Sequence, residues 1–132
     1  MKISRLLFAA LIVVAAGSTI VSYAAAPPKI VGTGTFPINV KAGDYDLITQ
    51  VIDLPPGGMI PKHTHGGPVV GYVVTGAVTL TDATGTHTVK AGESFNENVG
   101  TVHSGANNGS GPVRVSVSYL IPKGAEVTTF IK

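Results

Sequence analysis

Two stretches decide the fold of this chain: Gly-Gly-Met-Ile-Pro-Lys-His-Thr-His at residues 57–65 and Gly-Thr-Val-His-Ser-Gly-Ala-Asn at residues 100–107. Residues i and i+2 of a β-strand point to the same face, about 6.6 Å apart at roughly 3.3 Å rise per residue. His63 and His65 can therefore direct two imidazoles at one point. Imidazole is the commonest protein ligand of borderline metals. With His103 from a distant strand, three ligands would leave coordination positions open, as in catalytic metal sites.

Glycines and an asparagine frame these histidines at spacings that resemble the two motifs of the cupin family. The first motif, G-x5-H-x-H-x3-E-x6-G, aligns with residues 57–76, and the second, G-x5-P-x-G-x2-H-x3-N, with residues 92–107. Two positions depart from the motifs, with Val69 at the glutamate of the first and Asn98 at the proline of the second. A looser resemblance runs from about residue 48 to residue 123. The matching positions are Gly57, His63, His65, Gly76, Gly92, Gly100, His103 and Asn107.

The resemblance implies an all-β fold, the double-stranded β-helix or cupin jelly-roll barrel, with both motifs on neighbouring strands that line the barrel. It implies that His63, His65 and His103 bind a divalent metal ion, that the glycines occupy turns, and that Asn107 has a structural place at a strand end. A homodimer is one assembly that it suggests. Candidate metals are Fe, Zn, Ni, Cu and Mn. Since Val69 cannot bind a metal, a set of nitrogen ligands alone would shift the preference away from manganese.

Glu97 and His87 are the remaining side chains weighed for this site. Glu97 lies just before the second motif's turn and could act as a fourth ligand or accept an imidazole N–H. The alternative, a solvated loop residue, is favoured because glutamate is mostly exposed. His87 stands between two threonines of an alternating segment and is predicted to lie outside the site.

The rest of the chain is punctuated as in an all-β protein. Short β-branched and apolar segments are separated by Gly, Pro and Asp turns, and no 3.6-residue period is sustained beyond the N-terminal segment. Inward positions of two strands would either form an apolar lining suited to a small molecule or simply fill the core, namely Val69, Gly71, Val73 and Thr75, with Val115, Val117 and Tyr119. The expected strands are residues 30–40 (at an edge), 45–54, 59–65, 69–75, 78–81, 86–90, 94–97, 101–106 and 113–121.

The first 24 residues are predicted to be a secretion signal. Lys2 and Arg5 precede an apolar run over residues 6–16, and Ser-Tyr-Ala at residues 22–24 offers small residues for cleavage after Ala24. Cleavage would release one domain of residues 25–132 to the periplasm or the exterior. The alternative is a retained anchor, since residues 6–26 carry no charge and are long enough to span a bilayer.

Composition excludes some classes of partner and scaffold. The chain has no cysteine, which excludes a disulfide framework and a lipid-modified cysteine anchor. Without Lys2 and Arg5, seven basic residues face seven acidic ones, so the exported domain would be near neutral. No basic patch with interleaved aromatic residues indicates a nucleic-acid partner. No membrane partner is expected once the signal is removed.

Three functions remain open from the sequence. The first is a metal-dependent enzyme, such as an oxygenase, isomerase or hydrolase, acting on a small molecule. The second is a non-catalytic module that binds a metal or small ligand, and the third is a cupin scaffold that has lost its metal. Fold alone cannot separate them, because one fold hosts many chemistries.

Overall fold

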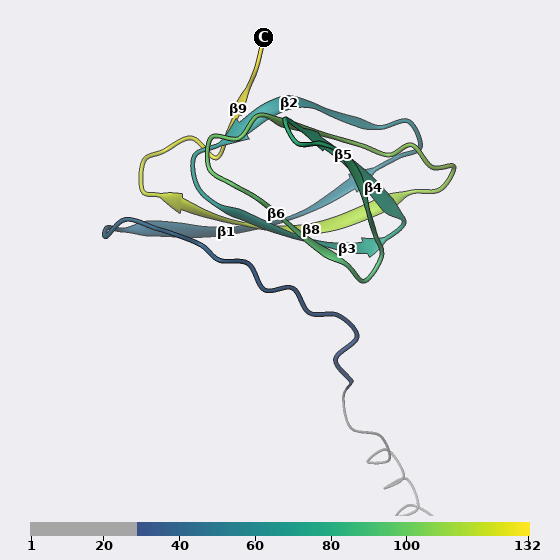
Figure 1. Cartoon of the computed structure of the whole chain (residues 1–132), viewed down its shortest axis with the longest axis horizontal. Helices are drawn as coiled ribbons and strands as arrows, with labels where there is room; N and C mark the ends of the chain where they lie inside the picture. The colour runs from purple at the N-terminus through teal and green to yellow at the C-terminus, as the bar shows by residue number, and fades with distance from the viewer. Residues whose placement is uncertain (1–28) are drawn as a thin grey trace, which may run out of the picture. The chain divides into compact units, whose positions relative to one another are not determined.

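Two antiparallel sheets face each other, and both motifs contribute to the space between them (Figure 1). The structure, a computed structural model, describes residues 29–132. The predicted signal peptide (residues 1–24), its cleavage after Ala24 and the alternative anchor (residues 6–26) lie outside the described residues. Residues 31–132 form one compact unit.

The described residues form nine strands. One sheet has four strands in the order β1-β8-β3-β6, and the other has five in the order β5-β4-β7-β2-β9. From residue 29 onward, the chain contains no helix of the length and apolarity needed to cross a membrane. Because the regular elements of the described residues are all β-strands in two antiparallel sheets, the predicted all-β fold is confirmed. The strands are β1 (Tyr45–Leu54), β2 (Met59–His65), β3 (Val69–Thr75), β4 (Ala77–Asp82), β5 (Gly85–Lys90), β6 (Ser94–Glu97), β7 (His103–Ala106), β8 (Val113–Pro122) and β9 (Thr128–Phe130).

The predicted edge strand at residues 30–40 is wrong, because this segment forms no strand. Gly32 and Gly34 lie so close to the backbone of Gly92 and the side chain of Ser94 that neither has room for a Cβ atom. The segment therefore packs closely beside β6 without joining its ladder. Pro37 adds a residue that cannot donate a ladder hydrogen bond.

The short strand β9 has no counterpart among the predicted strands. Its three residues carry no periodic pattern, and only pairing with β2 defines it. The second motif's strand, predicted at residues 101–106, begins at His103 because Thr101 closes a turn on Asn98, its N–H donating to that carbonyl at 3.1 Å. The four motif glycines, Gly57, Gly76, Gly92 and Gly100, all have φ between 73° and 89°, where a side chain would be strained.

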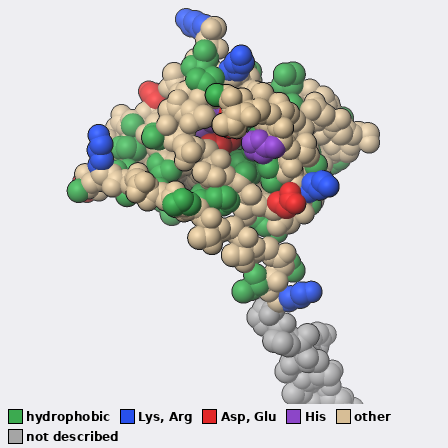
Figure 2. Space-filling view, in the orientation of Figure 1, with side chains coloured by type: hydrophobic (Ala, Val, Ile, Leu, Met, Phe, Trp, Pro, Cys, Tyr) green, Lys and Arg blue, Asp and Glu red, His purple; other side chains and the backbone are tan. Residues whose placement is uncertain are grey.

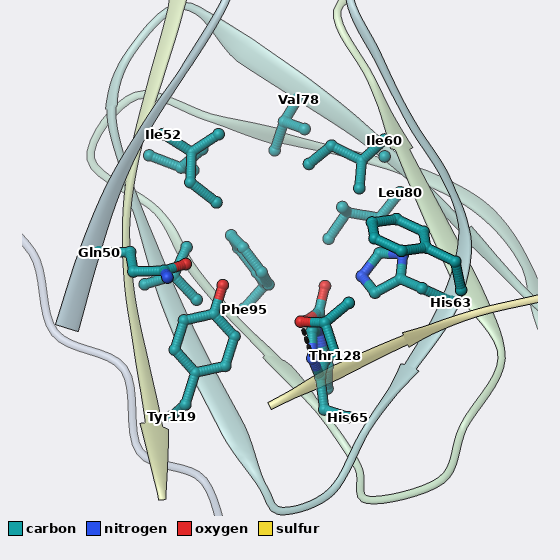
Figure 3. A pocket seen from close by; sticks show the side chains of 15 residues that line it. Gln50, Ile52, Ile60, His63, His65, Val78, Leu80, Phe95, Tyr119 and Thr128 are labelled. Carbon is teal, nitrogen blue, oxygen red and sulfur yellow. Dashed lines mark hydrogen bonds and ion pairs between the residues drawn. The ribbon is translucent and has the colours of Figure 1, made fainter. Parts of the chain in front are cut away.

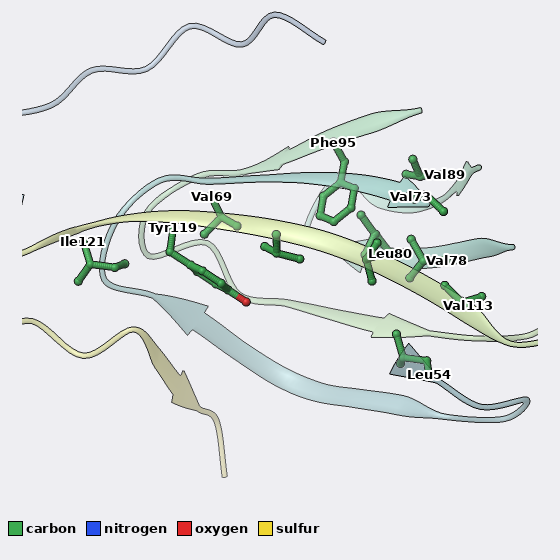
Figure 4. Packing of buried hydrophobic residues seen from close by; sticks show 12 residues of the cluster. Leu54, Val69, Val73, Val78, Leu80, Val89, Phe95, Val113, Tyr119 and Ile121 are labelled. Atoms are coloured by element: carbon green, nitrogen blue, oxygen red, sulfur yellow. The ribbon is translucent and has the colours of Figure 1, made fainter. Parts of the chain in front are cut away.

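Strand alternation builds the core on the inner faces of both sheets (Figure 4). Along β8, every second residue is buried, as the sequence predicts. Val69, Gly71 and Val73 of β3 share that inner face, but Thr75 is exposed because the β3–β8 register shifts between Val73 and Thr75. Gly71 is needed where it stands, because a methyl group there would overlap the Phe95 ring.

Candidate metal centre

Neighbouring strands bring the three motif histidines together. β2 pairs with β7, and His63 lies opposite His103 in that register. The ring centroid of His63 is 4.8 Å from that of His65 and 4.2 Å from that of His103. All three residues are buried, and each offers a nitrogen within 4.8 Å of the others' nitrogens. The predicted trio therefore meets in space and could hold a metal ion.

Backbone carbonyls hold each of the three rings by its Nδ1 atom. His63 donates to the Pro61 carbonyl at 2.7 Å, and His103 donates to the Thr101 carbonyl at 2.8 Å. A carbonyl can only accept, so each contact places the hydrogen on Nδ1. In a neutral ring, the lone pair is then on Nε2, as in metal-binding histidines whose outer nitrogen is tied to a carbonyl.

The third ring, His65, is held by a contact that sequence reasoning missed. Its Nδ1 lies 2.9 Å from the carbonyl oxygen of Val127, just before β9, and 3.2 Å from the Thr128 hydroxyl. The partner is 62 residues away in the chain, so no local motif could have indicated it. Phe130 of the same strand lies over His63, with ring centroids 5.8 Å apart. The strand β9 therefore belongs to the site.

Glu97 enters the site, contrary to the favoured prediction of a solvated loop residue. It is the last residue of β6, and its side chain is only 13% exposed. Its Oε2 lies 3.2 Å from Nε2 of both His65 and His103. The His103 Nε2 is buried and has no hydrogen-bond partner among the described residues, although the Glu97 carboxylate lies close to it. By contrast, His87 is exposed and does not belong to the group of three histidines.

The charges of these groups are strongly coupled. Burial alone would raise the pKa of Glu97, but His103 and His65 outweigh it and hold that pKa at about 2. Burial likewise opposes charge on His103, yet the Glu97 carboxylate raises the pKa of His103 above its usual value. Burial lowers the pKa of His63. Glu97 is thus ionised at neutral pH, and it favours a cation beside it.

A cavity of about 340 Å³ lies between the sheets, and two of the three histidines, His63 and His65, line it (Figure 3). Its volume is at the small end of the range for small-molecule sites. Figure 2 shows histidine and acidic side chains together at a hollow in the face that it draws. Tyr119 and Gln50 extend polar groups into the cavity from the opposite sheet (Figure 3). The apolar wall comprises Ile52, Ile60, Val78, Leu80, Phe95, Val115, Val117 and Phe130.

Removing residues 127–132 is expected to weaken Zn²⁺ binding by about 10–100-fold, the usual cost of losing a partner that orients a metal-binding histidine. The truncation removes the Val127 carbonyl and frees the His65 ring to rotate. Competition titration against a zinc chelator measures the change. The control is Phe130→Ala, which keeps β9 and this carbonyl and should bind zinc as the unaltered chain does. Equal weakening in both variants would assign the effect to loss of the Phe130 ring.

The cupin domain family profile matches residues 50–121, which is more than half of the chain. No curated protein gives a significant match. A double-stranded β-helix protein of Klebsiella pneumoniae is similar at 24% identity and TM-score 0.57, over 73% of this chain and 84% of that chain.

Two solved enzymes share the fold. Oxalate oxidase in complex with the substrate analogue glycolate aligns at 23% identity and TM-score 0.57, over 64% of this chain and 46% of that chain. A DMSP lyase aligns at 15% identity and TM-score 0.58, over 65% of this chain and 44% of that chain. At these identities, the likeness shows the fold alone. The family profile, the two facing antiparallel sheets and the converging histidines agree, and the chain belongs to the cupin family.

Proposed function

We propose that this chain is an exported cupin that binds one divalent metal ion through His63, His65 and His103 and acts on a small molecule in the adjacent cavity. The supporting observation is the orientation of the three rings. Each Nδ1 is tied to a backbone carbonyl, which leaves the three Nε2 lone pairs for a common ligand. The buried His103 Nε2 without a hydrogen-bond partner fits an ion at that place.

The cavity supplies the surroundings for a small, partly apolar substrate. When bound, the metal ion supplies a Lewis acid for a substrate oxygen and, if it is iron or copper, redox capacity. The mostly apolar wall of the cavity suits the apolar part of such a substrate. Burial, together with the negative charge of Glu97, raises the pKa of Tyr119. Its hydroxyl therefore stays protonated at neutral pH and can donate a hydrogen bond to the substrate.

The second candidate is a binding module without catalysis. It is favoured by the scarcity of acid–base groups, because Glu97 and Tyr119 are the only titratable residues besides the histidines on the described cavity wall. The Glu97 carboxylate lies against two of the histidines and is not free to abstract a proton from a substrate. A module of this kind would bind the same ligands and leave them unchanged.

One preparation tests export, metal content and turnover. The chain is expressed with its N-terminal segment, purified from the periplasm and examined by intact mass and elemental analysis. We expect the mass of residues 25–132 and about one divalent metal ion per chain. Oxygen uptake is then measured with small diols, diketones and hydroxy acids, the last because the similar oxalate oxidase was solved with glycolate.

The two candidate functions predict different results in this experiment. Turnover of one of these compounds supports the enzyme, whereas saturable binding without turnover supports the module. A mass that retains residues 1–24 would favour the membrane anchor. Protein that neither carries nor takes up a divalent metal would contradict the metal site.

A further inference from the structure

The first cupin motif has a glutamate at the position of Val69, and the residue opposite Val69 on the neighbouring strand is acidic. Val69 of β3 lies directly opposite Glu97 of β6 in the antiparallel register. Side chains at directly opposed positions project from the same face, with Cβ atoms about 4.5–5.5 Å apart. Val69 is buried on the inner face, so Glu97 projects to the same side. A carboxylate missing from one strand is therefore present at the neighbouring position of the next.

The Glu97 carboxylate lies close to the histidine nitrogens with which the motif glutamate would bind a metal ion. Its Oε2 lies 3.2 Å from Nε2 of His65 and 3.2 Å from Nε2 of His103. The outer nitrogens of both rings are tied to carbonyls, so two Nε2 lone pairs point toward a negatively charged oxygen. These groups repel each other unless a cation lies among them. A proton on one ring satisfies that need, and so does a metal ion shared by all.

We infer that Glu97 is the fourth ligand of the metal site, a carboxylate that acts from β6 at the place that the motif assigns to position 69. The inference rests on the proposed metal site of the three histidines. It replaces a set of nitrogen ligands alone by three nitrogens and one anionic oxygen. Such a set reduces the net charge of a bound divalent ion and admits harder ions, Mn²⁺ and Fe²⁺, beside Zn²⁺.

The first test is Glu97→Gln, measured by Mn²⁺ titration with electron paramagnetic resonance and by Zn²⁺ competition with a chelator. We expect Mn²⁺ affinity to fall about 100-fold and Zn²⁺ affinity about tenfold, because the harder ion depends more on the anionic oxygen. Glutamine keeps an oxygen of similar reach, so a residue that merely orients the rings would lose little. The matched control is Glu93→Gln, since Glu93 is exposed and its carboxylate accepts the Lys90 N–H at 2.8 Å, outside the site.

The second test moves the carboxylate back across the sheet. Glu97→Val should lose Mn²⁺ affinity as Glu97→Gln does, and the double variant Val69→Glu with Glu97→Val should regain at least tenfold of it. The two positions are opposed, so a glutamate at either one can approach the histidines. Thermal unfolding by circular dichroism shows whether each variant is folded. If the two variants that carry Glu97→Val unfold, Glu97→Gln alone decides whether Glu97 is a ligand.

The outcomes separate this inference from the proposed function. Loss of Mn²⁺ affinity in Glu97→Gln, with Glu93→Gln unchanged, supports Glu97 as a ligand. Affinity within twofold of the unaltered chain in Glu97→Gln, while His63→Ala abolishes binding, overturns the inference and leaves the three-histidine site intact. Unchanged binding in both Glu97→Gln and His63→Ala overturns the proposed metal site, and the inference with it. A folded double variant that regains no affinity also contradicts the inference.

Discussion

Replacing His63, His65 or His103 by alanine should lower Zn²⁺ affinity by about 100-fold or more in each case. Structural zinc sites bind with roughly 10–16 kcal/mol through four ligands, so one ligand contributes on the order of 3 kcal/mol, which is about 100-fold in affinity. Each of the three rings presents one nitrogen to the same point, so the three losses should be similar. Chelator competition gives the affinity, and elemental analysis of the purified variants gives the residual content.

The matched control for the three histidines is His87→Ala. His87 is exposed on β5 and contributes no nitrogen to the cluster, so its removal should leave Zn²⁺ affinity unaltered. Equal loss in all four variants would indicate nonspecific binding by surface imidazoles. No loss in any of them would contradict the metal site.

Replacing Asn107 by alanine should lower the free energy of unfolding by about 3–5 kcal/mol, a large part of the 5–15 kcal/mol typical of a domain. Asn107 is 1% exposed. Its Nδ2 donates to the Leu54 carbonyl at 2.9 Å and to the Gly111 carbonyl at 2.8 Å, and its Oδ1 accepts the Gly109 N–H at 3.0 Å. Alanine leaves all three backbone groups without their partner. The Leu54 carbonyl is buried, and leaving it unsatisfied costs about 1–3 kcal/mol, whereas the lost hydrogen bonds to the exposed Gly109 and Gly111 cost about 1 kcal/mol each.

Urea denaturation followed by circular dichroism measures the effect, and Asn108→Ala is the control. Asn108 is the exposed neighbour, and its truncation should change stability by less than about 0.5 kcal/mol. Asn107→Asp tests the donors separately, because an ionised carboxylate keeps the acceptor and loses both donors. If Asn107→Ala is as stable as Asn108→Ala, the three hydrogen bonds contribute nothing net to the fold.

Local sequence pattern determined most of the framework of this protein. Alternation along residues 113–121 indicated which side of β8 is buried, because side chains alternate between the two faces of a strand. The spacing of His63 and His65 placed both rings on one face for the same reason. The motif glycines were expected in turns, and their positive φ angles confirm it. Each of these features depends on residues that are close together in the chain.

Pairing between distant strands decided what the pattern left open. Glu97 points inward because it lies opposite Val69 in the β3–β6 register. The hydrogen bond from His65 to the Val127 carbonyl forms because β9 pairs with β2. Because glutamate is mostly exposed in proteins, Glu97 was predicted to be solvated. The nearby imidazoles instead offset the cost of burying its carboxylate. Residues 30–40 have the composition of a strand, yet they pack beside the edge strand β6 without pairing with it. The sequence by itself determined that His63 and His65 share one face, because their spacing is local, and the motif resemblance added His103. Only the tertiary structure decided which carboxylate and which carbonyl meet them, because those partners come from strands far away in the chain.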